Sequence, residues 1–197
     1  MGTDITLRCE CDAFVATIRD VDDPKANHVV CYCADCRAYA RHLGQETRIL
    51  DMQGGTDIVQ VQPHQIEFVQ GADRLAVVRM TRKGPFRWYA ACCDTPVFNT
   101  LGTPKLPFAG VIVAATDAAP DALGPVRFRH KPEQATGPVP DAPHGIPRLI
   151  LRNVAGMVRG RWSGRWRETP FFDVETGLAI AKPCTLTEAE RAAAYDT

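Results

Sequence analysis

The sequence lacks the features that mark secreted and membrane-spanning proteins. Its N-terminus has no basic stretch followed by an apolar run, and nowhere do about 18 apolar residues follow one another. It also lacks an excess of charge of one sign, because 23 Lys and Arg residues balance 23 Asp and Glu residues. We therefore expect a cytoplasmic protein with no membrane partner and no general attraction for nucleic acid.

The chain also lacks internal repeats, and its 197 residues suffice for one hydrophobic core with an extension. Hydrophobic residues make up 45% and charged residues 23%, as is typical of folded domains. Residues 1–116 contain most of the strand-like sequence. Residues 117–147 are rich in proline and indicate a linker or wrapping arm, and residues 148–197 predict a helical extension packed on the core.

Short runs rich in Val, Ile and Phe predict antiparallel sheets, so the expected fold class is mainly β with short helices. Glycine and proline residues separate the runs and suggest turns between them. The expected strands cover residues 13–18, 57–61, 65–70, 75–80, 86–90 and 109–115.

Three helices are predicted. The first runs from Cys36 to Leu43, with Asp35 as its N-cap. An amphipathic pattern predicts the second within residues 148–165. A capping box, Thr185 to Glu188, is expected to open the terminal helix.

Cysteine is plentiful, and seven of the 8 cysteines fall into close groups. These are Cys9 with Cys11, Cys31 with Cys33 and Cys36, and Cys92 with Cys93. In a reducing compartment such groups are more often metal ligands or catalytic thiols than disulfides. Cys184 stands alone and is expected to fill space in the core.

The two cysteine pairs suit a structural zinc ion. Zinc prefers a tetrahedral shell of thiolates, and two pairs on turns can close such a shell. Cys9 and Cys11 are therefore expected to meet Cys92 and Cys93. Neighbours in a strand point to opposite faces, so both members of the second pair can bind only if the chain turns near Asp94.

The three-cysteine motif predicts a different kind of site. Three protein ligands leave the fourth zinc position open for water or a substrate thiolate. Cys36 also lies at the predicted start of a helix, where free N–H groups and the helix dipole favour a thiolate. The same thiols are therefore candidates both for binding zinc and for attacking an electrophile.

Cys-x-Cys near the N-terminus, Cys-x-Cys-x-x-Cys from Cys31 and a late cysteine before a Thr-Pro turn together resemble the glutathione-dependent formaldehyde-activating enzyme (GFA) family, also called the centromere protein V/GFA domain. The resemblance covers about residues 5–116. It implies an Mss4-like fold of small antiparallel sheets. It further implies a structural zinc ion on Cys9, Cys11 and Cys93, and a second zinc ion at the three-cysteine motif.

The chain departs from the family pattern at two places. The family usually has Gly after the first Cys-x-Cys, where this chain has Asp12, and a late Cys-x-x-Cys-Gly, where this chain has Ala90-Ala91-Cys92-Cys93-Asp94. Either Cys92 replaces the ligand absent at Ala90, or the structural site has three thiolates.

The resemblance implies a carbon–sulfur lyase with Cys31, Cys33 and Cys36 as its active centre. A thiol such as glutathione would be held as a thiolate and attack a small aldehyde or another electrophile. Asp35, His42 and His28 are candidates for moving the proton. Two alternatives remain, a non-catalytic zinc module that binds a protein or nucleic acid and a thiol redox or metal-sensing protein.

The extension carries a segment rich in arginine and tryptophan. Six arginines lie between Arg148 and Arg167, interleaved with Trp162 and Trp166. Such a surface can bind an anionic ligand or stack on bases, but large aromatic side chains more often anchor packing. We expect the tryptophans to dock this segment against the sheet.

Overall fold

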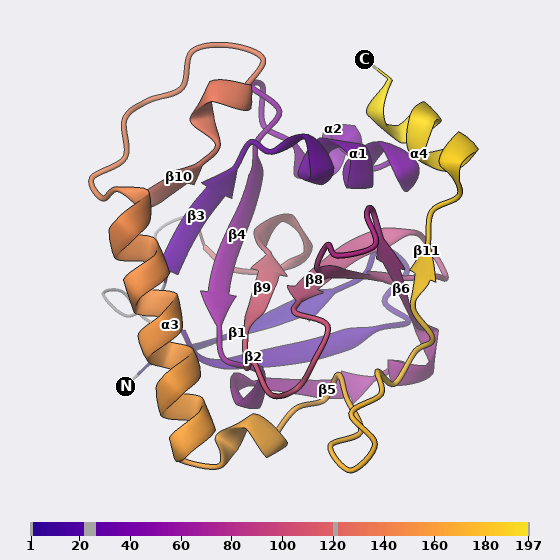
Figure 1. The fold of residues 1–197 in the computed structure, drawn as a ribbon, viewed down its shortest axis with the longest axis vertical. Coiled ribbons are helices and arrows are strands. Elements are labelled where there is room, and N and C mark those ends of the chain that lie inside the picture. Colours follow the sequence, from indigo (N-terminus) through magenta and orange to yellow (C-terminus); the bar gives the residue numbers. More distant parts are fainter. Residues whose placement is uncertain (1, 22–26, 120–121, 197) are drawn as a thin grey trace.

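The computed structural model describes residues 2–21, 27–119 and 122–196, and this part of the chain is mainly β, with two sheets and a few helices (Figure 1). Residues 120 and 121 of the predicted arm lie outside the described residues. The strands are β1 (Thr3–Arg8), β2 (Val15–Val21), β3 (Asn27–Cys31), β4 (Thr56–Val61), β5 (Ile66–Gln70), β6 (Leu75–Arg79), β7 (Phe86–Ala90), β8 (Thr95–Thr100), β9 (Ala109–Ile112), β10 (Phe128–His130) and β11 (Cys184–Thr185). The α-helices are α1 (Ala34–His42), α2 (Glu46–Ile49), α3 (Ile146–Trp162) and α4 (Glu188–Tyr195).

The smaller sheet joins three of the described strands in the order β1-β2-β5, and all its pairs are antiparallel. Burial alternates along β1, where Ile5 and Leu7 are buried and pair with Ile18 and Ala16 of β2. This alternation follows from the two-residue period of a strand that covers a core on one face.

The larger sheet joins eight of the described strands in the order β10-β3-β4-β9-β8-β7-β6-β11. Its centre is antiparallel, whereas β10 pairs with β3 and β11 pairs with β6 in parallel. Both edge strands come from the segments predicted as an arm and a helical extension. Residues 117–147, predicted as a linker or wrapping arm, thus contain a short strand, and β10 fits between Pro125 and Pro132 because an edge strand needs pairing on one side only.

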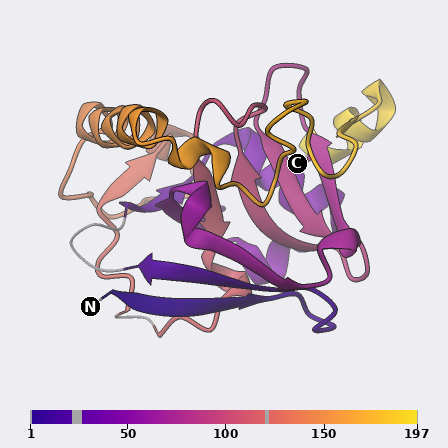
Figure 2. The ribbon, with the colours of Figure 1, turned by 90° about the horizontal axis from the view of Figure 1, so that it is seen from below.

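The two sheets form layers, with the N-terminal hairpin on one side and the larger sheet on the other (Figure 2). Between them lies an aromatic cluster. Phe171 is fully buried, and its ring centroid lies 5.2 Å from those of Phe68, Trp88 and Phe98. A short segment of the C-terminal extension therefore fills the space between the sheets.

The six strands expected from sequence all exist, with ends that differ from the expected ones by at most three residues. The run from Ala109 leaves the sheet after Ile112 and continues as a 3₁₀ turn, Val113–Ala115. Strands β1, β3 and β8 were not predicted, and neither were the short edge strands β10 and β11. β3 and β8 are buried along their whole length, and their Asn27, His28 and Asn99 side chains hide that burial from a hydrophobicity pattern.

The helix boundaries differ from the predictions in two ways. Cys33, not Asp35, is the N-cap of α1, and Asp35 lies in the first turn, where a carboxylate favours the helix dipole. The capping box of α4 uses Thr187 and Glu190, because Thr185 is already paired in β11. Helix α4 packs on α1 near the C-terminus (Figure 1). Within the described ranges, every helix is too short or too polar to cross a membrane.

Candidate metal and thiol centres

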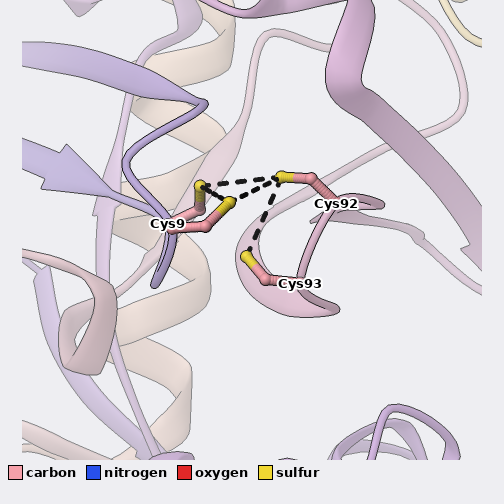
Figure 3. Close-up of side chains that lie close together, drawn as sticks. Cys9, Cys92 and Cys93 are labelled. Atoms are coloured by element: carbon pink, nitrogen blue, oxygen red, sulfur yellow. Dashed lines mark hydrogen bonds between the residues drawn. The ribbon is translucent and has the colours of Figure 1, made fainter.

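The first centre brings together four cysteines from two hairpins. Cys9 and Cys11 lie in the turn that follows β1, and Cys92 and Cys93 lie in the turn between β7 and β8. Figure 3 shows Cys9 facing Cys92 and Cys93. The sulfur of Cys9 lies 3.6 Å from that of Cys11 and 3.8 Å from that of Cys92. The Cys92 sulfur lies 3.2 Å from that of Cys11 and 3.8 Å from that of Cys93. Because each hairpin belongs to a different sheet, this centre connects the two sheets.

Both turns at this centre depend on residues with positive φ. Asp12 has φ 56° and Asp94 has φ 52°, a left-handed conformation that glycine adopts most easily and aspartate tolerates. In the first turn the Phe14 N–H donates to the Cys9 sulfur at 3.2 Å, which fixes the direction of that thiol. The chain does turn at Asp94, so both Cys92 and Cys93 face the centre.

The four thiols have unequal acidity. Burial raises the pKa of Cys93, but hydrogen bonds from the Thr95 hydroxyl and from Cys11 outweigh it and lower that pKa to about 7. Burial and the neighbouring thiols raise the pKa of Cys92 to about 12. Thiols so close together release their protons together only when a cation binds between them, so the cluster is compatible with a metal ion.

The second centre contains the three cysteines of the Cys-x-Cys-x-x-Cys motif. Cys31 ends β3, Cys33 caps α1 and Cys36 lies in the first turn of that helix. The Cys33 sulfur lies 3.4 Å from each of the other two sulfurs. Cys31 and Cys36 are buried, whereas Cys33 is partly exposed. These thiols also have the geometry of a metal site.

A buried guanidinium accompanies the second centre. Arg87 of β7 is only 5% exposed, and its Nη1 donates to the Cys36 sulfur at 3.6 Å and to Asn99 Oδ1 at 3.2 Å. Hydrogen bonds from Cys31 and Cys33, together with the charge of Arg87, hold the pKa of Cys36 well below its usual value. Arg87 was not predicted as a site residue. The sequence does carry a signal for this residue, because Arg87 is the single arginine inside the apolar run Phe86–Ala90. Along a strand, its side chain lies on the face opposite to Phe86 and Trp88.

A cavity of about 600 Å³ opens over the three thiols. Its lining includes the titratable side chains of Asp35, Arg87, His130 and Lys131. Of the proposed proton carriers, Asp35 lines this cavity, and it accepts a hydrogen bond from the Tyr195 hydroxyl at 2.5 Å. His130 was not predicted as a site residue. Its position follows from sheet register, because it pairs with Cys31 where β10 meets β3.

The two histidines considered as proton carriers lie elsewhere. His28 is buried, and its ring nitrogens lie 2.7 Å from Asp57 Oδ1 and 2.8 Å from the Gly124 carbonyl. His42 ends α1, and neither histidine belongs to the described lining of the cavity. The two buried contacts of His28 favour a structural role for it. His42 lies at the end of a helix, away from the cavity.

Of the remaining sequence features, Trp162 and Cys184 are exposed and Trp166 is partly buried. Trp162 is 88% exposed, so the prediction that both tryptophans dock on the sheet is wrong for Trp162, because α3 buries the opposite side that carries Leu149 and Gly160. Trp166 lies between two guanidinium groups, with Arg161 at 4.7 Å and Arg167 at 4.6 Å from its ring centroid. Cys184 lies exposed on edge strand β11, so the expectation that it fills the core is also wrong.

Comparison with known proteins identifies a family and finds distant structural likenesses. No curated protein matches the chain. A crystal structure of a Rhodobacter sphaeroides protein, determined as a structural genomics target, is similar at 18% identity over 62% of this chain and 98% of that chain, with a TM-score of 0.43. The model of one family, described as "Family of unknown function (DUF6151)", matches residues 1–182. The chain therefore belongs to the DUF6151 family.

Proposed function

We propose that the protein is a zinc-dependent enzyme of the carbon–sulfur lyase type, which joins a thiol such as glutathione to a small aldehyde or another electrophile. The observation that carries the proposal is the three-thiol centre at the floor of a cavity of about 600 Å³, beside the buried cation of Arg87. A thiol centre that is open to a cavity, and not closed by a fourth protein ligand, is the arrangement expected of a catalytic site.

The spacing of the sulfurs supports zinc as the metal. Thiolates at about 2.3 Å from a tetrahedral zinc ion lie about 3.8 Å from one another. The four sulfurs of the first centre have contacts of 3.2 to 3.8 Å, and those of the second centre have contacts of 3.4 Å. Cys9, Cys11, Cys92 and Cys93 would hold a structural ion, and Cys31, Cys33 and Cys36 would hold a second ion with one open position.

Bound zinc would supply Lewis acidity and keep a substrate thiol ionised at neutral pH. The other steps belong to residues of the chain. Arg87 offsets the negative charge that gathers on Cys36 and its neighbours. The substrate thiolate forms a bond to the carbonyl carbon, the C=O electron pair moves to oxygen, and the thiol proton is returned to that oxygen. His130 or Asp35, which line the cavity, would carry this proton and release a thiohemiacetal.

The conformation of two residues supports the resemblance to the GFA family with its Mss4-like fold. Asp12 and Asp94 occupy the places where that family usually has glycine, and both have positive φ. The departures in sequence therefore preserve the backbone conformation that glycine would supply. Four sulfurs also gather at the first centre, which favours Cys92 as the replacement for the ligand absent at Ala90.

The proposal is tested by following C–S bond formation from glutathione and ¹³C-labelled formaldehyde by NMR. The wild-type protein should raise the initial rate above the uncatalysed reaction, and Cys33→Ser should lower the rate to background. Cys184→Ser is the matched control, because it removes an exposed thiol outside both centres, and it should retain the wild-type rate. A wild-type rate equal to background with each of several thiols and aldehydes would refute the proposal.

One observation favours a second candidate, a non-catalytic zinc module that binds a partner. Trp162 is 88% exposed at the end of α3 and directly follows Arg161, whose guanidinium lies over the Trp166 ring. Exposed tryptophan beside arginine is typical of binding surfaces. If Trp162→Ala abolishes binding of a partner while Cys33→Ser leaves it intact, the extension has a binding role independent of the thiol centre.

A further inference from the structure

A second cavity adjoins the one above the three thiols. It has a volume of about 260 Å³ and shares Cys31, Ile58, Phe108 and His130 with the first cavity. The shared residues make the two cavities neighbours along strands β3 and β4. These four residues form the boundary between the two cavities, so a molecule bound at the thiols lies next to the second cavity.

The walls of the second cavity are mostly apolar. Val29 of β3 forms one side, and Ile146, Leu149 and Ile150 of α3 form the other. Leu149 is 5% exposed and packs with Val29 and Phe128, so this wall is part of the folded structure. Gln60 and Asn153 add polar groups to the lining. Such a lining favours a hydrocarbon chain or ring over a charged group.

We propose that the substrate of the three-thiol centre carries an apolar group and that this second cavity binds it. The inference rests on the proposed function, and it names a substrate class for that site. A volume of 260 Å³ holds roughly eight water-sized groups, which matches an alkyl chain of about six carbons or a benzyl group. Helix α3 lies outside the region of the GFA resemblance. Its side chains would then determine which apolar groups the site accepts.

The proposal is tested by alkylation of thiols, which needs no lyase activity. N-methylmaleimide and N-hexylmaleimide differ only in the length of the alkyl chain, and in both cases the thiolate sulfur adds to the alkene carbon while the neighbouring carbon gains a proton. Labelling of each cysteine in the protein as purified is followed by peptide mass spectrometry. Cys33 reports on the cavity, and exposed Cys184 is the internal control in the same molecule.

In the wild-type protein, the hexyl-to-methyl rate ratio at Cys33 should exceed the ratio at Cys184 by about tenfold, because several methylene groups leave water. Ile150→Trp narrows the cavity from its half-exposed rim and should reduce the ratio at Cys33 to that at Cys184. Leu151→Trp is the matched control, because Leu151 is 68% exposed and does not line the described cavity. It should leave the ratio unchanged.

Equal hexyl-to-methyl rate ratios at Cys33 and Cys184 in the wild-type protein would overturn the inference. A ratio at Cys33 that stays unchanged in Ile150→Trp would also overturn it. These outcomes are separate from the test of the lyase reaction. If maleimide labelling shows the chain-length preference but the NMR assay shows no C–S product, the apolar site is supported and the lyase activity is refuted. Product formation with formaldehyde but without a chain-length preference would refute the apolar site alone.

Discussion

The guanidinium of Arg87 lies 3.6 Å from the sulfur of Cys36, and both side chains are buried. A buried cation is costly unless an anion or several hydrogen-bond acceptors surround it. Asn99 accepts one hydrogen bond, so the main compensation must come from thiolate charge. A divalent ion with three thiolates carries one net negative charge, which one arginine balances.

Replacing Arg87 by Met should weaken metal binding at the three-cysteine centre by about 10- to 100-fold, because a residue that contacts a ligand supports its thiolate form. The pKa of Cys36 should rise from its low value, so alkylation of the metal-free thiol should begin at higher pH. Titration with a competing chelator measures the affinity. Arg82→Met, an exposed change nearby in the chain, is the control and should leave affinity unchanged. Equal affinity in the two variants would contradict this role for Arg87.

Asp94→Gly should stabilise the protein by up to about 1 kcal/mol, because glycine adopts positive φ without steric cost. Asp12→Gly should act in the same direction, and alanine at either position should destabilise. Asp73→Gly is the control, since Asp73 lies in a 3₁₀ turn outside the positive-φ set, and it should lower stability. Urea unfolding measures the change in unfolding free energy for all five substitutions. Destabilisation by Asp94→Gly would show that the aspartate side chain matters more than the backbone.

The His28–Asp57 pair should make stability depend on pH. Burial lowers the pKa of His28, but the hydrogen bond and charge of Asp57 and the Gly124 carbonyl outweigh it and raise the pKa above 6.5. The stabilisation is then complete below the unfolded pKa and is lost as pH rises through the folded pKa. Asp57→Asn should therefore destabilise more at about pH 6 than at about pH 8.5. The same loss of unfolding free energy at both values would contradict the pairing.

Phe171→Ala should destabilise the protein by about 3–5 kcal/mol, because a fully buried ring leaves a cavity among Phe68, Trp88 and Phe98. Leu178→Ala, in the same segment but 68% exposed, should change stability by less than about 0.5 kcal/mol. Thermal or urea unfolding measures both. If the two substitutions had equal effects, the segment would not contribute to the core as described.

The strands that alternate or run through apolar residues could be predicted from sequence, because their pattern reflects burial of their own side chains. Strands β10 and β11 could not, since each is only two or three residues long and exists because a neighbouring strand offers free backbone groups. The insertion of Phe171 between the sheets was equally hidden. Nothing near Phe171 in sequence indicates which surface it covers.

The cysteine groups could be predicted because metal ligands on turns are close in sequence as well as in space. The other residues of the second centre could not, because sheet register brings them there. Arg87 pairs with Asn99 across β7 and β8, and His130 pairs with Cys31 across β10 and β3. Such partners lie far from the motif in sequence, and their side chains suit many surface positions equally well.

We propose that the two cysteine clusters bind two zinc ions, one structural and one at an open catalytic centre. Metal content by plasma mass spectrometry tests it most directly, on untagged protein purified without added metal, compared with Cys11→Ser and Cys33→Ser. Two zinc ions per wild-type chain, with one lost in each variant, is the predicted result. A single zinc ion that is lost only in Cys11→Ser would contradict a metal at the three-cysteine centre, and protein free of zinc would contradict both sites.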